Sequence, residues 1–184
     1  LVIGDNNKIR EYVTINPGTV GGGGKTIIGN NCLFMVSSHV AHDCLLGNNI
    51  IIANNVAIAG HAIIDDHVII GGNSAVQQFT RIGKMAMIGG MTGVLSDVIP
   101  FGLSLGNRNN LMGLNLIGLR RSKVSNENIK KIQLAYELIF KSIKFRENIG
   151  SLSNELKNNE FIKKILNFIN KDKKRPISLP PDIK

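Results

Sequence analysis

Aliphatic side chains recur at every sixth position through the first half of the chain. The unbroken column comprises Ile28, Phe34, Val40, Leu46, Ile52, Ile58, Ile64, Ile70, Val76, Ile82, Ile88 and Val94. Neither the 3.6-residue period of a helix nor the alternation of an ordinary strand gives this spacing. A strict period of six instead predicts a parallel β-helix, a solenoid whose short strands stack coil upon coil.

A second column, two residues before each aliphatic position, holds small or β-branched side chains, among them Cys32 and Cys44. Such residues suit a narrow interior, because larger side chains would overpack it. We therefore interpret both cysteines as interior thiols, since no CxxC motif accompanies them. Glycines such as Gly47 directly follow the aliphatic residue, and we expect them to let the backbone bend at the corners.

The six-residue period begins earlier, at Ile3, Ile9 and Ile15, and then shifts by one residue across positions 19–24. This stretch contains four consecutive glycines, Gly21–Gly24. A short glycine-rich loop is therefore expected to interrupt the solenoid. We do not interpret it as a phosphate-binding loop, because no Gly-Lys-Ser/Thr sequence leads into a helix.

The period changes near Ser125, where the sequence has the composition of a helix start. Apolar residues then follow at helical spacing: Ile129, Ile132, Leu134, Ala135, Leu138, Ile139 and Ile143. A second amphipathic segment spans 152–169, and prolines between 176 and 181 end regular structure. We predict a mainly β fold with a β-helix (1–105), a connecting segment (106–124) and a small helical domain (125–184).

The charge of the chain is concentrated in its helical end. The formal net charge is +9, and residues 119–184 carry sixteen Lys/Arg against seven Asp/Glu. A basic surface attracts acidic proteins, anionic lipids or nucleic acid. Nucleic acid is disfavoured, because aromatic side chains are not interleaved with the charges. With no signal-peptide pattern and no apolar run long enough to span a bilayer, we expect a cytoplasmic protein without stable membrane insertion.

The repeat resembles that of the hexapeptide acyltransferase superfamily. The resemblance implies a left-handed β-helix with three hexads per coil and assembly as a homotrimer. Residues eighteen apart would then stack at about the usual strand spacing of 4.8 Å. This rule places Gly60 beside His42, and His61 beside Asp43.

Such a cluster is suited to acyl transfer to an alcohol. A neutral imidazole with a carboxylate against its other nitrogen can accept a hydroxyl proton near neutral pH. The N–H of Gly60 is free of a side chain and can approach a carbonyl oxygen that gains negative charge. The spacing alone leaves two interpretations open: a catalytic cluster, or the polar residues that exposed solenoid corners carry in any case.

Six ordered motifs narrow the choice. They are HVAHDC (39–44), IAGH (58–61), QQF (77–79), GN (106–107), GLN (113–115) and GLRR (118–121). In order and spacing they resemble the UDP-N-acetylglucosamine O-acyltransferases of lipid A biosynthesis. The resemblance also implies further N-terminal coils, which precede the position of Leu1 in that family.

The resemblance implies transfer of a 3-hydroxyacyl chain from acyl carrier protein to the glucosamine 3-hydroxyl of UDP-N-acetylglucosamine, with no metal or other cofactor. His42 matches the general base, Asp43 its orienting carboxylate and Gly60 the oxyanion donor. Gly90 matches the position that limits acyl-chain length. The substrate-binding positions are matched by His39, His61, Gln78, Asn115 and Arg121.

Three positions depart from the family pattern: Gln77, Ile117 and Ser122. None of these departures falls on a candidate catalytic residue. Another hexapeptide acyl- or acetyltransferase on a nucleotide sugar, or a non-catalytic β-helix binding protein, remain the alternatives. Acyl carrier protein is acidic, so the basic residues near the helical junction are either its contacts or ordinary solvated helix faces in a lysine-rich segment. They are Arg120, Arg121, Lys123, Lys130, Lys131, Lys141 and Lys144.

Overall fold

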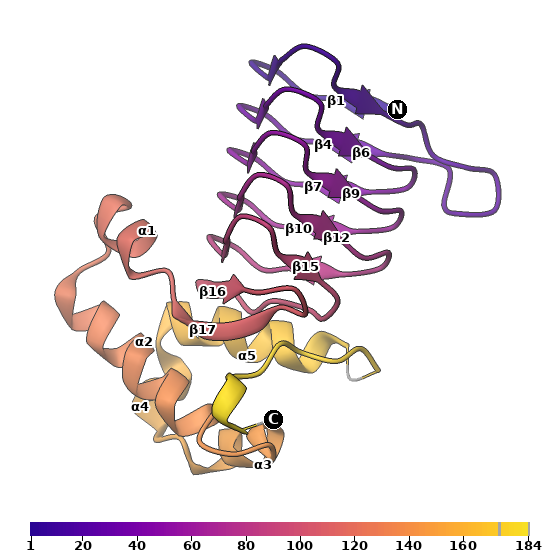
Figure 1. Cartoon of the computed structure of the whole chain (residues 1–184). Coiled ribbons are helices and arrows are strands. Elements are labelled where there is room, and N and C mark those ends of the chain that lie inside the picture. The colour runs from indigo at the N-terminus through magenta and orange to yellow at the C-terminus, as the bar shows by residue number, and fades with distance from the viewer. Residues whose placement is uncertain (173, 184) are drawn as a thin grey trace.

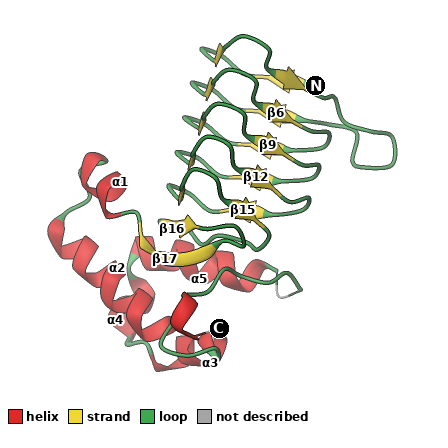
Figure 2. Ribbon diagram, in the orientation of Figure 1, coloured by secondary structure: helices red, strands yellow, loops and turns green. Residues whose placement is uncertain are grey.

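The computed structural model describes residues 1–172 and 174–183 and shows a left-handed parallel β-helix with helices packed at one end (Figure 1). Each coil passes through three short strands, and the stacked strands form three sheets (Figure 2). We call them sheets A, B and C, in the order in which the chain visits them. The mainly β fold predicted from the period of six is confirmed.

The strands belong to the sheets as follows. Sheet A contains β1 (Val2–Ile3), β4 (Ile27–Ile28), β7 (Leu45–Leu46), β10 (Ile63–Ile64) and β13 (Arg81–Ile82). Sheet B contains β2 (Lys8–Ile9), β5 (Leu33–Phe34), β8 (Ile51–Ile52), β11 (Ile69–Ile70), β14 (Met87–Ile88), β16 (Gly102–Leu105) and β17 (Asn110–Leu114). Sheet C contains β3 (Thr14–Ile15), β6 (His39–Val40), β9 (Ala57–Ile58), β12 (Ala75–Val76) and β15 (Gly93–Val94).

Both predicted columns line the solenoid interior. Phe34 and Ile58 in the aliphatic column and Cys44 in the small column are all 0% exposed. Each aliphatic side chain buried in this way contributes roughly 1.5–3 kcal/mol. Cys32 and Cys44 are free thiols, and burial raises the pKa of each, so both stay protonated. Their interpretation as interior packing residues is confirmed.

The corners are built differently from the expectation. At the corners, the left-handed residue is not the glycine that follows the strand but the residue two positions later, for example Asn31 (φ 58°), Asn49 (φ 57°) and Asn55 (φ 58°). Asparagine tolerates this conformation better than most residues. Position 47 requires glycine for another reason, because a Cβ there would lie 2.6 Å from Oδ1 of Asp66 on the next coil. The glycines permit close stacking of coils, so their predicted role in bending was wrong.

The predicted glycine loop is present and projects from the solenoid (Figure 1). Ile3 pairs with Ile28, whereas Leu46 pairs with Ile64 on the regular spacing, so the coil that contains the loop is longer than the others. The extra residues lie between β3 and β4 and are folded back on Thr19. The carbonyl of Thr19 accepts hydrogen bonds from the N–H groups of Gly22 (3.1 Å) and Gly24 (3.0 Å).

The helical end contains α1 (Leu116–Arg121), α2 (Asn126–Ile139), α3 (Phe145–Asn148), α4 (Asn154–Asn158) and α5 (Glu160–Lys171), with 3-10 turns at Ile149–Ser151 and Pro181–Ile183. Ser125 caps α2 as predicted.

Leu134 and Ile143 do not join the core, because they are 48% and 63% exposed. The predicted connecting segment, 106–124, contains β17 and α1. No helix among the described residues has both the length and the apolarity to cross a bilayer.

One buried carboxylate joins the helical end to the solenoid. Asp97 is 0% exposed and forms ion pairs with Arg81 (Nε to Oδ2, 2.7 Å) and Arg175 (Nε to Oδ1, 3.1 Å). The Arg81 guanidinium also lies 4.5 Å from the ring centre of Phe168 in α5. A β-bridge between Asp97 and Ile177 brings the C-terminal segment alongside. These contacts connect β13, α5 and the C-terminal segment.

Candidate active site

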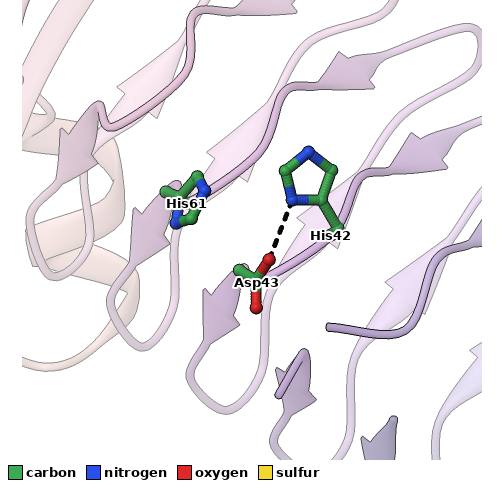
Figure 3. Close-up of side chains that lie close together, drawn as sticks. All are labelled: His42, Asp43 and His61. Atoms are coloured by element: carbon green, nitrogen blue, oxygen red, sulfur yellow. Dashed lines mark hydrogen bonds and ion pairs between the residues drawn. The ribbon is translucent and has the colours of Figure 1, made fainter. Parts of the chain in front are cut away.

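Three titratable side chains meet where the chain passes from sheet C to sheet A, which we call the C–A corner (Figure 3). His42 and Asp43 follow β6, and His61 follows β9 on the next coil. Nδ1 of His42 lies 2.9 Å from Oδ2 of Asp43. The rings of His42 and His61 meet edge to face, with centroids 5.2 Å apart. The second nitrogen of His42, Nε2, points away from Asp43 on a side chain that is 40% exposed.

The regular coil explains this grouping. Asp43, His61 and Phe79 occupy equivalent left-handed corner positions on successive coils, with φ of 58°, 60° and 63°. Their side chains are therefore stacked. The ring of Phe79 lies against His61 with centroids 4.6 Å apart and an interplanar angle of 16°. Phe79 received no role from the sequence, although its place eighteen residues after His61 was a sufficient signal.

Asp43 is held from the glycine loop. The Thr19 N–H lies 3.1 Å from both carboxylate oxygens, and the Thr19 hydroxyl donates to Oδ2 at 2.7 Å. Burial raises the pKa of Asp43, but the hydrogen bonds from Thr19 and His42 outweigh burial and lower it to about 2. Asp43 is therefore a carboxylate at neutral pH. A carboxylate at this place favours the tautomer of His42 that has its proton on Nδ1 and its lone pair on Nε2.

Gly60 completes the cluster. It is buried, and a Cβ at this position would lie 2.8 Å from Cε1 and 2.9 Å from Nε2 of His42. Only glycine lets the backbone approach the imidazole this closely. Among the described residues, no group accepts a hydrogen bond from the Gly60 N–H. The stacking of Gly60 against His42 and of His61 against Asp43, predicted from the repeat and from the coil length that the resemblance implies, is confirmed.

The same cluster contains donor atoms that bind transition metals. Candidate ligand atoms of His42, Asp43 and His61 lie within 4.8 Å of one another. Both oxygens of Asp43, however, already accept hydrogen bonds from Thr19, and Oδ2 also meets Nδ1 of His42. The carboxylate is thus satisfied by hydrogen bonds alone. The absence of a metal from the working site stays a prediction.

Two further predicted substrate-binding residues lie on the same part of the solenoid. His39 is on β6, where Nδ1 lies 2.7 Å from the Thr14 hydroxyl of the preceding coil. Gln78 is exposed at the C–A corner, directly before Phe79. His39 and Gln78 therefore flank the cluster along sheet C and at its corner. Their contact with a substrate stays a prediction.

The remaining predicted residues lie elsewhere in the chain. Gly90 is exposed at the corner between sheets B and C. Asn115 is the N-cap of α1, where Oδ1 accepts from the Gly118 N–H and Nδ2 donates to the Met85 carbonyl, each at 2.9 Å. Its amide therefore anchors α1 at the corner between sheets A and B. Arg121 is exposed at the end of α1. A single chain does not bring these three residues to His42.

Two family models match the chain. Residues 97–178 match the second domain of UDP N-acetylglucosamine O-acyltransferase, and residues 25–60 match the bacterial transferase hexapeptide of six repeats. Relatives named as acyl-(acyl carrier protein)–UDP-N-acetylglucosamine O-acyltransferases are similar along almost the whole chain. The protein from Rhizobium etli is 46% identical over 98% of this chain and 66% of its own length. That from Paracoccus denitrificans is 48% identical over 92% and 64%.

Solved structures agree with the sequence comparisons. A UDP-N-acetylglucosamine O-acyltransferase from Moraxella catarrhalis superposes with a TM-score of 0.89 at 42% identity, covering 95% of this chain and 68% of that one. The UDP-N-acetylglucosamine acyltransferase from Campylobacter jejuni gives 0.88 at 39% identity, covering 97% and 69%. The chain thus spans about two thirds of the length of these relatives.

Proposed function

The chain belongs to the UDP-N-acetylglucosamine O-acyltransferase family, and from this premise we propose that it moves a 3-hydroxyacyl chain from acyl carrier protein to the glucosamine 3-hydroxyl of UDP-N-acetylglucosamine. This reaction is the first step of lipid A biosynthesis. The proposal includes a cytoplasmic location and no metal or other cofactor. The observation that carries it is the His42–Asp43 pair, whose free Nε2 faces the Gly60 backbone.

The chemistry follows from these three residues. Nε2 of His42 accepts the proton of the sugar 3-hydroxyl as its oxygen attacks the thioester carbonyl carbon. The imidazolium that forms is stabilised by Asp43, which stays ionised. The negative charge that develops on the carbonyl oxygen is stabilised by the Gly60 N–H. When the carbon–sulfur bond breaks, His42 returns the proton to the leaving thiolate, so base and acid are the same residue.

Substituting Gly60 with alanine tests the proposed oxyanion contact. The new Cβ would overlap the His42 ring and stand beside the backbone N–H. We expect kcat to fall by about 10²–10³-fold, because the Cβ displaces both the His42 ring and the backbone N–H, which alanine keeps, from their positions against the reacting carbonyl. Gly150→Ala, where a Cβ meets no atom within 4 Å, is the matched control and should leave kcat unchanged. A Gly60→Ala enzyme with wild-type kcat and wild-type melting temperature would remove Gly60 from the mechanism.

We propose that the active site is completed by a second subunit of a homotrimer. Gly90 and Asn115 lie at other corners than His42, and Arg121 lies at the end of α1, so they can serve one site only if neighbouring chains contribute them. Exposed apolar side chains on sheet A, including Ile27 (37%) and Leu45 (43%), offer a surface for contact between chains. Sedimentation equilibrium, which measures the mass of the assembly, tests this part of the proposal.

The basic helical end supports acyl carrier protein as the donor. Arg120, Arg121 and Lys123 are exposed at the end of α1 and just after it. Lys131 is less available, because it forms ion pairs with Glu127 (2.8 Å) and Glu155 (2.9 Å). An acidic carrier protein would therefore be attracted more strongly to the end of α1 than to Lys131. A steep fall in kcat/KM for the donor with rising salt is the expected signature.

Gly90 offers a test of acyl-chain selection. The position is exposed, and the nearest atom to a Cβ there is the Gly72 carbonyl oxygen at 3.3 Å. A Gly90→Met side chain would occupy space available to a long acyl chain. We expect kcat/KM for the preferred long-chain donor to fall at least about 10-fold, because the misfit of a single methylene in an apolar pocket can change kcat/KM by this factor. Turnover of shorter donors is the internal control. An unchanged chain-length preference would exclude Gly90 as the limit.

A comparison of acyl donors separates the proposal from its alternatives. The protein is supplied with UDP-N-acetylglucosamine and either 3-hydroxyacyl carrier protein or acetyl-CoA. We expect turnover only with the carrier-protein thioester. Turnover only with acetyl-CoA would identify an acetyltransferase, and binding of the nucleotide sugar without turnover of any donor would identify a non-catalytic β-helix.

A further inference from the structure

We propose that the glycine loop between β3 and β4 is a clamp on the catalytic carboxylate, and that Thr19 is a positioning residue for the His42–Asp43 pair. The inference rests on the proposed function, because it assigns a role within the same active site. Thr19 does not touch His42 directly. It acts through Asp43, to which it donates both its backbone N–H and its hydroxyl proton.

The contacts of Asp43 explain why the carboxylate depends on the loop. Its backbone N–H donates to the Thr26 hydroxyl at 2.8 Å, which fixes the main chain. Its side chain is 2% exposed, so water cannot replace a lost partner easily. The donors that reach the carboxylate are Thr19, from the loop, and His42, from its own coil. Without Thr19, the Asp43 carboxylate would keep only His42 as a hydrogen-bond partner and could rotate away from the imidazole.

The glycines of the loop fit this role. A Cβ at Gly22 would overlap the Asp43 carboxylate and the Thr19 hydroxyl, and would lie 2.7 Å from Cγ of Asp43. At Gly21 a Cβ would meet no atom within 4 Å. The close approach to Asp43 therefore requires glycine at position 22. At position 21 there is space for a side chain. This difference provides a matched pair of variants.

The first test replaces Thr19 with valine, which keeps the size of the side chain and removes the hydroxyl. We expect kcat to fall about 10-fold, because a hydrogen bond to a charged group is lost, while KM for both substrates changes less than about 2-fold. Thr19→Ser, which keeps the hydroxyl, should restore kcat. Val20→Ala, which shortens a fully exposed side chain of the same loop, is the control and should behave as wild type.

The second test uses the glycine pair. Gly22→Ala should lower kcat as Thr19→Val does, and Gly21→Ala should leave kcat unchanged. Wild-type kcat in both Thr19→Val and Gly22→Ala would overturn the clamp. So would a loss in Thr19→Val that Thr19→Ser fails to restore, since the hydroxyl would then not be the active group.

A third measurement does not require turnover. The carboxyl carbon of Asp43 can be titrated by NMR in the wild type and in Thr19→Val. The groups that face this carboxylate are Thr19, His42 and His61, and the Thr19 hydrogen bonds help to hold the pKa of Asp43 at about 2. We expect this pKa to rise in Thr19→Val, and an unchanged pKa would contradict the clamp. A wild-type protein without acyl transfer would overturn the proposed function, while this titration would still decide the role of Thr19.

Discussion

Replacing His42 with alanine is expected to lower kcat by about 10²–10⁴-fold, the range that a positioned general base contributes. Nε2 of His42 is the proposed proton acceptor, because a carboxylate 2.9 Å from Nδ1 favours the tautomer with its proton on Nδ1. The side chain is 40% exposed and supports no part of the solenoid core. Melting temperature should therefore hardly change. Initial rates with saturating donor and acceptor measure the effect.

The control for this variant is His67, an exposed histidine at the corner between sheets A and B. Its backbone is left-handed (φ 60°), so asparagine is the suitable replacement. His67→Asn should turn over at the wild-type rate. If His42→Ala keeps more than about a tenth of the wild-type kcat, a loss smaller than general-base catalysis supplies, His42 is not the base.

Replacing Asp97 with alanine is expected to lower the free energy of unfolding by about 3–5 kcal/mol. The substitution leaves the guanidinium of Arg81, a residue that is 6% exposed, without its carboxylate, and it removes the ion-pair partner of Arg175. A buried charge without a partner is far more costly than the net worth of the pair. The helical end should loosen first, because Asp97 connects it to the last coils. Urea unfolding followed by circular dichroism, at one fixed protein concentration, measures the change.

Glu127→Ala is the comparison for Asp97. The Glu127 side chain is 76% exposed and pairs with Lys131 on the surface of α2, so its loss should cost less than about 1 kcal/mol. If Asp97→Ala costs no more than Glu127→Ala, the buried network does not hold the helical end in place.

The solenoid could be predicted from the sequence because its interior repeats. The coils from Ile28 to Val94 bury the same two columns, so Val40, Ile58 and Val76 carry the same constraint and the period is visible without any contact information. The same repeat predicted the approach of His61 to Asp43, since the offset between coils is fixed by strand pairing. Local periodicity thus predicted the solenoid, and together with the three hexads per coil that the family resemblance implies it predicted the centre of the candidate site.

Features outside the repeat could not be predicted in this way. Thr19 reaches Asp43 across an inserted loop, and the length of an insertion does not say where its residues point. Asn115 matched a substrate-binding position, yet its amide caps α1 and bonds to Met85, an arrangement that depends on how the helix packs. Leu134 had the right helical spacing for the core, but the helices bury a narrower face than the pattern suggested.

The most direct test of the central claim is analysis of the product formed by the wild-type chain from 3-hydroxyacyl carrier protein and UDP-N-acetylglucosamine. The account predicts a nucleotide sugar heavier by one 3-hydroxyacyl group, with the ester on the glucosamine 3-hydroxyl as assigned by NMR. It also predicts that His42→Ala forms this product only at a trace rate. An unmodified nucleotide sugar, or an ester formed equally well without His42, would contradict it.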